Sequence, residues 1–208
     1  MTDVAEEAAA AALAGLLVVV PTDTVYGIGT RPDDHEGTRR IFEAKGRPRD
    51  MDLPVLVPSI DGAAAVGQLD DRTRDLVARF WPGPLTVVVR RTERSRAWEL
   101  GGRGETIGIR MPAHSVALGV LERTGPLAVT SANRSGEPTP ETCDGIEKVF
   151  GDAVAVYVCD ETPLEGLAST VVDMTTDPPS VLRAGRDALH IERWLAKNPE
   201  LDTQNGTM

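Results

Sequence analysis

Aromatic residues are scarce in this sequence of 208 residues. Phe, Trp and Tyr together make up 4% of the chain, whereas hydrophobic residues as a whole make up 41%. The core must therefore be built from aliphatic side chains, which suits the buried strands of an α/β sheet. Proteins that bind single-stranded nucleic acid stack bases on aromatic rings, so this shortage also argues against that class.

Cysteine is also rare, and its spacing argues against a metal-binding or disulfide-rich fold. Cys143 and Cys159 form no C-x-x-C pair, so they support neither a zinc site nor a disulfide framework. We expect both to be buried free thiols, as in a cytosolic protein. Near the N-terminus, Glu6 and Glu7 replace the basic residues of a signal peptide, and the apolar run 16–21 is too short to span a bilayer. These features predict a cytoplasmic protein.

Several familiar catalytic motifs are missing. The sequence has no G-x-x-x-x-G-K-[ST] phosphate loop and no G-x-S-x-G nucleophile elbow. The GIG at 27–29 is followed by Arg31 and Pro32, where a dinucleotide-binding fingerprint would enter a helix. The histidines lack metal-ligand spacing and are expected at the surface or at helix ends: His35, His114 and His190.

The charge balance is acidic and limits the choice of partners. Lys and Arg number 22 against 32 Asp and Glu, which gives a formal net charge of -10. Such a surface repels nucleic acid and anionic membranes at long range, so we expect no stable nucleic-acid binding and no membrane association. A small anion could bind only where cations gather locally.

The hydrophobic pattern predicts alternating helices and strands in one domain, residues 1–197. The predicted strands are 16–20, 53–57, 85–89, 106–110, 126–129, 154–158, 169–174 and 180–183. The predicted helices are 3–15, with Asp3 as N-cap, 33–45, 60–69, 70–81, 115–124, 142–150 and 187–196. Segments 21–30 and 92–104 are predicted as loops, and 198–208 as a frayed tail with little to bury.

The stretch KGRPRDMDLPVLV, residues 45–57, joins cations to an apolar run. Lys45, Arg47 and Arg49 follow a predicted helix and precede a predicted buried strand. Cations at a helix C-terminus complement the helix dipole, and taken alone this interpretation is favoured. The alternative is a site for an anion such as a nucleotide phosphate.

Polar residues also lie within or directly after other predicted strands. They are Thr22 to Thr24, Arg110, Ser131 to Asn133, and Ser169-Thr170 leading to Arg183. Each alone is explained as a turn residue or a surface charge. Together they offer cations for phosphates, an arginine for a carboxylate and hydroxyl groups for an amino-acid-like ligand. None is a strong nucleophile with an adjacent base, so the set favours catalysis by positioning and charge neutralisation, as in nucleotidyl transfer.

At these positions the sequence resembles the YrdC-type threonylcarbamoyl-AMP synthases. The resemblance runs from about residue 16 to about residue 186. It rests on seven strings in family order: PTDTVYGIG, KGRPRDMDLPVLV, FWPGPLTVVV, TIGIRMPAH, GPLAVTSANRSGEP, STVVDMT and VLRAG. The sequence ends after the region that resembles the catalytic domain, without the C-terminal domain of the longer branch of the family.

The resemblance implies a fold and a reaction. The expected fold is a twisted mixed β-sheet flanked by helices, with a basic concave cavity. The expected reaction converts L-threonine, bicarbonate and ATP into threonylcarbamoyl-AMP and pyrophosphate, and a separate complex uses the product to modify tRNA. Mg²⁺ is expected to arrive with ATP, because the sequence offers no dedicated carboxylate cage.

The family's motifs also imply site residues. Lys45 and Arg47 are expected to hold the ATP phosphates and to neutralise charge as pyrophosphate leaves. The residues expected around the nucleotide are Lys45, Arg47, Met51, Thr106, Val129, Asn133, Thr139 and Arg183. The residues expected around threonine are Thr22, Thr24, Arg110, Ser131 and Ser169. Arg110 is expected to orient the threonine carboxylate, and the choice between Thr22 and Thr24 stays open. We also expect Lys45→Ala and Arg47→Ala to leave the fold intact, because cations in loops rarely hold a core together.

Some positions depart from the family pattern. Met51 and Asp52 replace a polar residue and a proline, Leu56 replaces a common histidine, and Asp-Glu-Thr at 160–162 replaces Asp-Gly-Gly. These changes keep open a paralogue that makes another carbamoyl or acyl adenylate. A further alternative is an RNA-binding protein that acts on tRNA or ribosomal precursors, although the acidic charge and few aromatics count against it.

Overall fold

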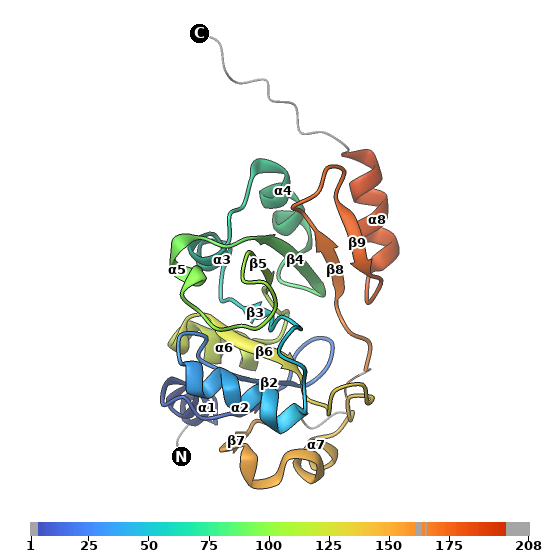
Figure 1. Cartoon of the computed structure of the whole chain (residues 1–208). Helices are drawn as coiled ribbons and strands as arrows, with labels where there is room; N and C mark the ends of the chain where they lie inside the picture. The colour runs from blue at the N-terminus through green and yellow to red at the C-terminus, as the bar shows by residue number, and fades with distance from the viewer. Residues whose placement is uncertain (1–3, 161–163, 165, 199–208) are drawn as a thin grey trace.

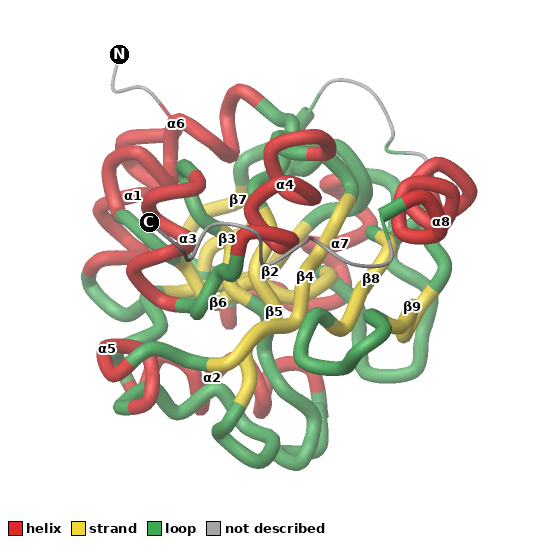
Figure 2. The backbone as a smooth tube through the Cα atoms, turned by 90° about the horizontal axis from the view of Figure 1, so that it is seen from above, coloured by secondary structure: helices red, strands yellow, loops and turns green. Residues whose placement is uncertain are grey.

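The computed structural model describes residues 4–160, 164 and 166–198. A 9-stranded sheet of order β7-β1-β2-β6-β3-β5-β4-β8-β9 runs through the molecule (Figures 1 and 2). The strands are β1 (Val18–Val20), β2 (Gly27–Thr30), β3 (Val55–Leu56), β4 (Leu85–Arg90), β5 (Thr106–Arg110), β6 (Leu127–Ser131), β7 (Val156–Tyr157), β8 (Thr170–Asp173) and β9 (Ser180–Arg183). The sheet contains both parallel pairs (β1 with β7, β3 with β5, β4 with β8) and antiparallel ones, so the predicted mixed α/β sheet is confirmed.

Helices surround the sheet (Figure 2). They are α1 (Val4–Leu13), α2 (His35–Lys45), α3 (Ile60–Val66), α4 (Asp71–Phe80), α5 (Glu93–Arg96), α6 (Ser115–Thr124), α7 (Cys143–Phe150) and α8 (Ala188–Lys197), with a 3-10 turn at Gly151–Ala153. All seven predicted helices are present with slightly different ends. Among the described residues, no helix combines the length and the apolar character needed to cross a bilayer.

The core lies on both faces of the sheet. Val19 joins one apolar cluster, whereas its neighbours Val18 and Val20 join a second cluster that α1 and α6 cover. Successive side chains of a strand point to opposite faces, so a strand buried on both sides reads as a continuous apolar run. The run at 16–20 was predicted as a central strand for this reason, and the structure confirms it.

The prediction that 21–30 is entirely a loop is wrong. Gly27–Thr30 form β2, which pairs with β1 and with β6. A Cβ atom on Gly27 would come within 2.5 Å of Val129 Cγ1, and one on Gly29 within 2.5 Å of Ala128 O. These glycines let a central strand pack closely against β6, which is the use of glycine in a strand that a loop interpretation overlooks.

Two further predictions need correction, and two lie outside the described residues. Segment 92–104 contains the short helix α5, so it is not wholly a loop. Cys143 and Cys159 form a disulfide with a Cα–Cα distance of 5.4 Å, so the prediction of buried free thiols is wrong. The two cysteines are 16 residues apart in sequence, and the chain reversal between α7 and β7 brings them together. Asp3 as an N-cap and the tail at 199–208 lie outside the described residues.

Candidate functional site

Lys45 is the last residue of α2 and is positioned by the caps of that helix. Asp34 accepts hydrogen bonds from the backbone N–H groups of Glu36 and Gly37 at the start. Gly46 ends the helix in the left-handed conformation, with φ of 59°. A left-handed residue at this point is most often glycine, because other side chains are strained there. The chain therefore turns at Gly46, and Lys45 faces inward.

The Lys45 side chain reaches the end of β6. Its Nζ donates to Ser131 O at 2.5 Å and to Asn133 O, and it lies 3.4 Å from Asn133 Oδ1. The residue is 2% exposed. Burial, with a smaller contribution from the charge of Arg47, lowers the pKa of the Lys45 ammonium to about 8. Lys45 of the expected K-x-R motif is thus brought together with Ser131 and Asn133 of the S-x-N motif.

Asn133 extends this contact into the following loop. Its Nδ2 donates to Arg134 O and Glu137 O, both at 2.7 Å, and its Oδ1 accepts from Thr139 Oγ1 at 3.2 Å. The buried side chain therefore fixes the loop that precedes α7. We call Lys45, Ser131, Asn133 and Thr139 the Lys45 cluster.

Arg47 lies apart from these contacts and folds back on its own loop. Its Nη2 donates to Asp52 O at 2.8 Å, and its Nε lies 3.4 Å from Met51 O. Burial lowers the pKa of the Arg47 guanidinium, and the Asp52 carboxylate partly opposes the shift. Arg47 is only partly buried, and the Met51 side chain is 45% exposed. Both side chains can reach a ligand on this side of the loop.

Arg110 ends β5 and forms a second centre. Its Nε donates to Gly83 O at 3.0 Å, its Nη1 to Thr24 Oγ1 at 2.7 Å and its Nη2 to Asp23 Oδ1 at 2.5 Å. Arg110 is 6% exposed. Burial lowers the pKa of its guanidinium, Asp23 opposes that shift, and the charges of Arg183 and Arg186 add to it.

The loop 21–26 connects the two centres. Thr22 Oγ1 lies 3.0 Å from Thr24 Oγ1 and donates to Val25 O at 2.6 Å. Tyr26 O accepts from Ala132 N at 2.8 Å, beside Asn133 of the Lys45 cluster. Thr24 contacts Arg110, whereas the Thr22 hydroxyl serves the turn. Of the two threonines, Thr24 is therefore the one that joins the second centre.

Ser169, just before β8, adds hydroxyl groups to the second centre. Its Oγ lies 2.9 Å from Thr86 Oγ1 and 3.1 Å from Arg183 Nη2, and Arg183 also donates to Ser169 O at 2.9 Å. Burial lowers the pKa of the Arg183 guanidinium. We call Asp23, Thr24, Arg110, Ser169 and Arg183 the Arg110 cluster. The structure thus groups Arg183 with the residues expected at threonine rather than with Asn133 and Thr139.

Three positions have mainly structural contacts. Val129 and Leu56 lie in the apolar cluster under α1 and α6, at 5% and 6% exposure. Thr106 is half-buried, and its carbonyl accepts from Arg91 Nε at 2.8 Å. Because Leu56 is buried in this cluster, a polar side chain at its position would have no contact with solvent.

Sequence reasoning missed Asp23, Gly83, Thr86 and Arg186. Asp23 Oδ1 also accepts from Ala113 N at 2.9 Å, and Arg186 Nη1 donates to Asp23 O at 2.9 Å. Asp23 lies inside the PTDT string and Gly83 inside WPGP, but only the fold brings both to Arg110. Arg110 is a buried strand-end cation, and such a cation needs an acid or hydrogen-bond acceptors nearby, so a search for its partner is the signal that could have found Asp23.

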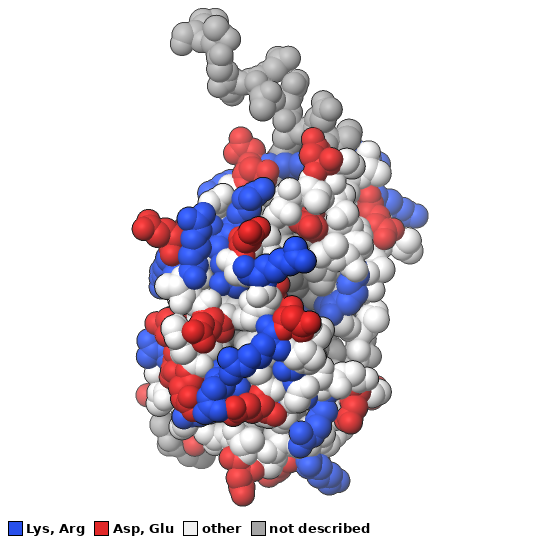
Figure 3. Space-filling model, in the orientation of Figure 1, with Lys and Arg blue, Asp and Glu red and all other residues white. Residues whose placement is uncertain are grey.

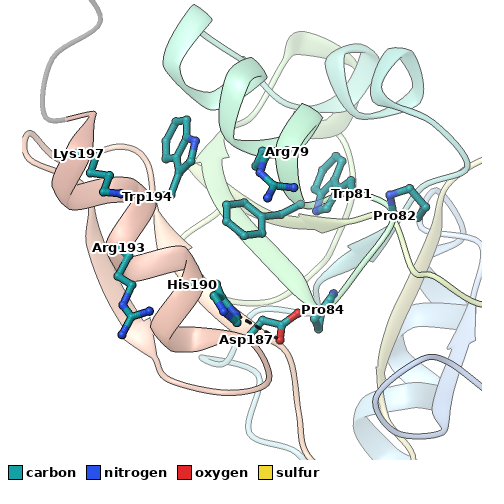
Figure 4. Close-up of a pocket in the computed structure, with 10 residues that line it drawn as sticks. Arg79, Trp81, Pro82, Pro84, Asp187, His190, Arg193, Trp194 and Lys197 are labelled. Carbon is teal, nitrogen blue, oxygen red and sulfur yellow. Dashed lines mark ion pairs between the residues drawn. The ribbon is translucent and has the colours of Figure 1, made fainter.

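A separate cavity of about 560 Å³ lies between α4 and α8 (Figure 4). Arg79 and Trp81 line one side, and His190 and Trp194 line the other. None of the predicted site residues lines it, although its wall includes Pro82 and Pro84 on either side of Gly83. In the part of the chain that the structure describes, no group of three or more His, Cys, Asp or Glu side chains is suited to hold a metal ion.

Comparison with known proteins places the chain in a family. The Sua5/YciO/YrdC family, described as telomere recombination, matches residues 10–185. The chain belongs to this family. The predicted resemblance is therefore confirmed, and the family's mixed α/β fold agrees with the sheet described above. The basic concave cavity stays a prediction.

Relatives in the family carry one activity name. A putative threonylcarbamoyl-AMP synthase of Mycobacterium leprae is 45% identical over 181 residues, which cover 86% of this chain and 81% of the relative. A threonylcarbamoyl-AMP synthase of Pyrococcus abyssi is 40% identical over 174 residues, which cover 82% of this chain and 51% of the relative. The crystal structure of P. abyssi Sua5 complexed with L-threonine superposes with a TM-score of 0.79 at 35% identity, over 88% of this chain and 54% of that one. The chain thus spans about half the length of the P. abyssi protein.

Proposed function

We propose that this protein is an L-threonylcarbamoyladenylate synthase, a nucleotidyltransferase. The proposal rests on one observation: the loop 21–26 connects two clusters, each of which contains a buried cation. The Lys45 cluster and the Arg110 cluster together contain nine family-derived or neighbouring positions, and each cluster offers groups that suit one substrate. The activity names of the relatives support the same assignment.

The Arg110 cluster suits an amino acid. A guanidinium that is already oriented by Asp23, Thr24 and Gly83 presents its remaining N–H groups in a fixed plane. A planar guanidinium matches a carboxylate in two-point geometry. The Thr24 and Ser169 hydroxyls can accept or donate beside it. We assign L-threonine to this side, with its carboxylate on Arg110.

The Lys45 side suits a nucleotide. Arg47 is held only by loop carbonyls, so it can exchange them for phosphate oxygens when ATP binds. Lys45 keeps the S-x-N segment in place and adds positive charge to that side. Asn133, Thr139 and Met51 complete the proposed nucleotide surface. Positioning and charge neutralisation are the main means by which proteins assist phosphoryl and nucleotidyl transfer.

The proposed reaction has two steps. The threonine nitrogen first forms a C–N bond with bicarbonate, and water leaves to give a carbamate. A carbamate oxygen then bonds to the α-phosphorus of ATP while the bond to pyrophosphate breaks. Mg²⁺ enters with ATP and screens the phosphate charge. Transfer of the product to a tRNA-modifying complex in the cytoplasm is part of the same proposal.

The test is pyrophosphate release from ATP by the purified protein. We expect release that requires both L-threonine and bicarbonate, together with a product of the mass of threonylcarbamoyl-AMP. Release that persists without either substrate, or no release, contradicts the proposal. Release with another amine would favour a paralogue, and tRNA binding without turnover would favour the RNA-binding alternative.

A further inference from the structure

A second cavity, of about 420 Å³, lies between α2 and the loop that follows α5. Its walls contain the guanidinium groups of Arg39, Arg49, Arg91, Arg96 and Arg103, but one acid, Glu99. In a chain of net charge -10, this concentration of positive charge is local. Figure 3 shows basic side chains gathered over the region of α5. None of the residues proposed for ATP or threonine lines the cavity.

Arg91 is the buried member of the set. It is 1% exposed, and it donates from Nε to Thr106 O at 2.8 Å and from Nη1 to Trp98 O at 3.0 Å. Its Nη2 has no hydrogen-bond partner among the residues that the structure describes, and the Asp52 carboxylate lies 4.0 Å away. A buried guanidinium without full compensation is unfavourable, because its charge has left water. The wall of the cavity therefore carries positive charge that the surrounding residues do not fully neutralise.

Two of the lining charges are already paired. Glu99 lies 3.4 Å from His35 Nδ1, and Arg39 forms ion pairs with Glu36 and Glu43 on its own helix. The single acid in the cavity therefore faces an imidazole, and Arg39 contributes little free charge.

Three arginines remain available on the rim. Arg49, Arg96 and Arg103 are exposed, and none has an ion pair with an acid among residues 4–160, 164 and 166–198. Arg49 lies over the Phe42 ring, with 5.8 Å from Cζ to the ring centroid, which directs its guanidinium along the wall. Cations from three separate segments thus surround one hollow.

The glycine-rich segment 101–104 forms a wall that only glycine allows. Gly101, Gly102 and Gly104 have φ of 80°, 61° and 76°. A Cβ on Gly102 would come within 1.9 Å of Asp52 Oδ1, and Gly102 N donates to Arg49 O at 2.9 Å. The wall is therefore packed against segment 49–52, and it holds Arg103 at the edge of the cavity.

The chemistry of the cavity selects a small ligand with several negative charges. Arginine binds phosphate oxygens in two-point geometry, and several arginines suit several phosphates. The rings of Phe42 and Trp98 are 5% and 8% exposed, so they cannot serve as stacking platforms for unpaired bases. The acidic surface elsewhere repels a long polyanion. A compact oligophosphate fits the volume and the charge better than a nucleic acid.

We propose that this arginine cavity is a second anion site, which binds a small ligand carrying two or more linked phosphates. The ligand bridges Arg96 of α5, Arg103 of the glycine-rich segment and Arg49 of the segment that follows α2. Inorganic oligophosphates and nucleoside triphosphates share this chemistry. The site is separate from the surface proposed for ATP, which contains Arg47.

The test is calorimetric titration of the full chain with inorganic tripolyphosphate. The Arg47→Ala variant weakens the proposed ATP surface, so binding that remains in it reports the second site. We expect Arg96→Ala combined with Arg103→Ala to weaken this binding at least about tenfold, since each hydrogen bond to a charged group contributes about that factor or more. Arg94→Ala is the control for the Arg96 change, because it removes one positive charge from the same helix at a position outside the cavity.

The outcomes separate the possibilities. Equal binding of tripolyphosphate and ATP in the Arg47→Ala variant assigns the site to phosphates alone, and tighter binding of ATP adds a nucleoside to the ligand class. Either result supports the proposal when the variant with Arg96→Ala and Arg103→Ala loses this binding. The proposal is overturned when that variant binds tripolyphosphate as the Arg94→Ala control does, or when Arg47→Ala alone abolishes all binding. It is also overturned when the arginine pair affects binding of tRNA but not of tripolyphosphate.

Discussion

Lys45 and Arg110 are both long cations that the fold buries, yet their charges are compensated in different ways. Lys45 faces carbonyl and amide oxygens of residues 131–133, which carry no net charge. Arg110 faces the carboxylate of Asp23 as well as neutral oxygens. Burial lowers the pKa of both groups, and that of the Lys45 ammonium falls to about 8, whereas an arginine guanidinium stays protonated in proteins.

The difference shows how the two sides of the site are built. The Arg110 cluster is an ion pair that keeps its charge at any working pH and fixes an orientation for a carboxylate. The Lys45 cluster links α2 to the end of β6 by hydrogen bonds, and raising the pH can remove the charge of Lys45. Mutations should therefore affect the two clusters by different mechanisms and to different extents.

The largest effect is expected at the ion pair. Arg110→Gln leaves the Asp23 carboxylate, 15% exposed, without its cation, and breaking one partner of a buried pair costs about 3–5 kcal/mol. We expect the free energy of unfolding in urea to fall by that amount and turnover to be lost. The double variant Asp23→Asn with Arg110→Gln should recover much of the stability but not the turnover. Asp177→Asn is the control, because the Asp177 side chain is 87% exposed in its pair with Arg72, and at most about 1 kcal/mol is expected. Equal losses at the two pairs would contradict this account of Arg110.

The second effect concerns the disulfide, which follows the loop of the Lys45 side. Cys143 starts α7, directly after the loop that Asn133 fixes. A bond that closes a loop of this length stabilises the folded chain by about 3 kcal/mol. We expect a reducing agent to lower the midpoint of urea unfolding, and Cys143→Ser with Cys159→Ser to be equally destabilised but insensitive to the agent. An unchanged midpoint under reduction would show that the bond adds nothing to the folded state.

A smaller loss of stability is expected from Lys45→Met. This change removes the Lys45 donor from the Asn133 carbonyl and one of two donors from the Ser131 carbonyl, which keeps the Asn133 N–H, at a cost of about 1–3 kcal/mol. Lys148→Met on the exposed face of α7 is the matched control and should be close to neutral. A Lys45 variant as stable as the Lys148 variant would show that the hydrogen bonds of Lys45 do not stabilise the fold.

Arg47→Ala should remove turnover with little loss of stability, because its carbonyl partners lie in a partly exposed loop.

The Lys45 contacts lead to a different prediction from the one made from the sequence. The sequence suggested that Lys45 is a loop cation whose removal spares the fold. The residue is instead the buried end of α2, and the partner it stabilises is 86 residues away in the chain. Periodicity predicts where a helix ends, but it does not predict which distant backbone lies against its last turn.

Other parts of the structure were predictable to different degrees. The apolar runs of β1, β4 and β5 predict buried strands because their alternation and length are local properties. The strand β2 was not predicted, because Gly27 and Gly29 lack the apolar side chains by which a strand is usually identified. Close packing against β6 requires glycine at these positions. Asp23 and the disulfide depend on long-range placement, which no local pattern carries. The family motifs gave most of the site residues, since motif order already encodes that placement.

The smallest effect is a pH dependence that separates the two cations. The unfolded chain holds the Lys45 proton up to about pH 10.5, whereas the folded chain releases it from about pH 8. Between these values the unfolded state binds more protons, so raising the pH favours the folded state at this residue. We expect the difference in unfolding free energy between the wild type and Lys45→Met to grow with pH from about 8 upward. Urea unfolding of both proteins at pH 7, 8, 9 and 10 measures it. The corresponding difference for Arg110→Gln should stay constant over that range, and a constant difference for Lys45 as well would mean that its carbonyl partners keep the ammonium charged.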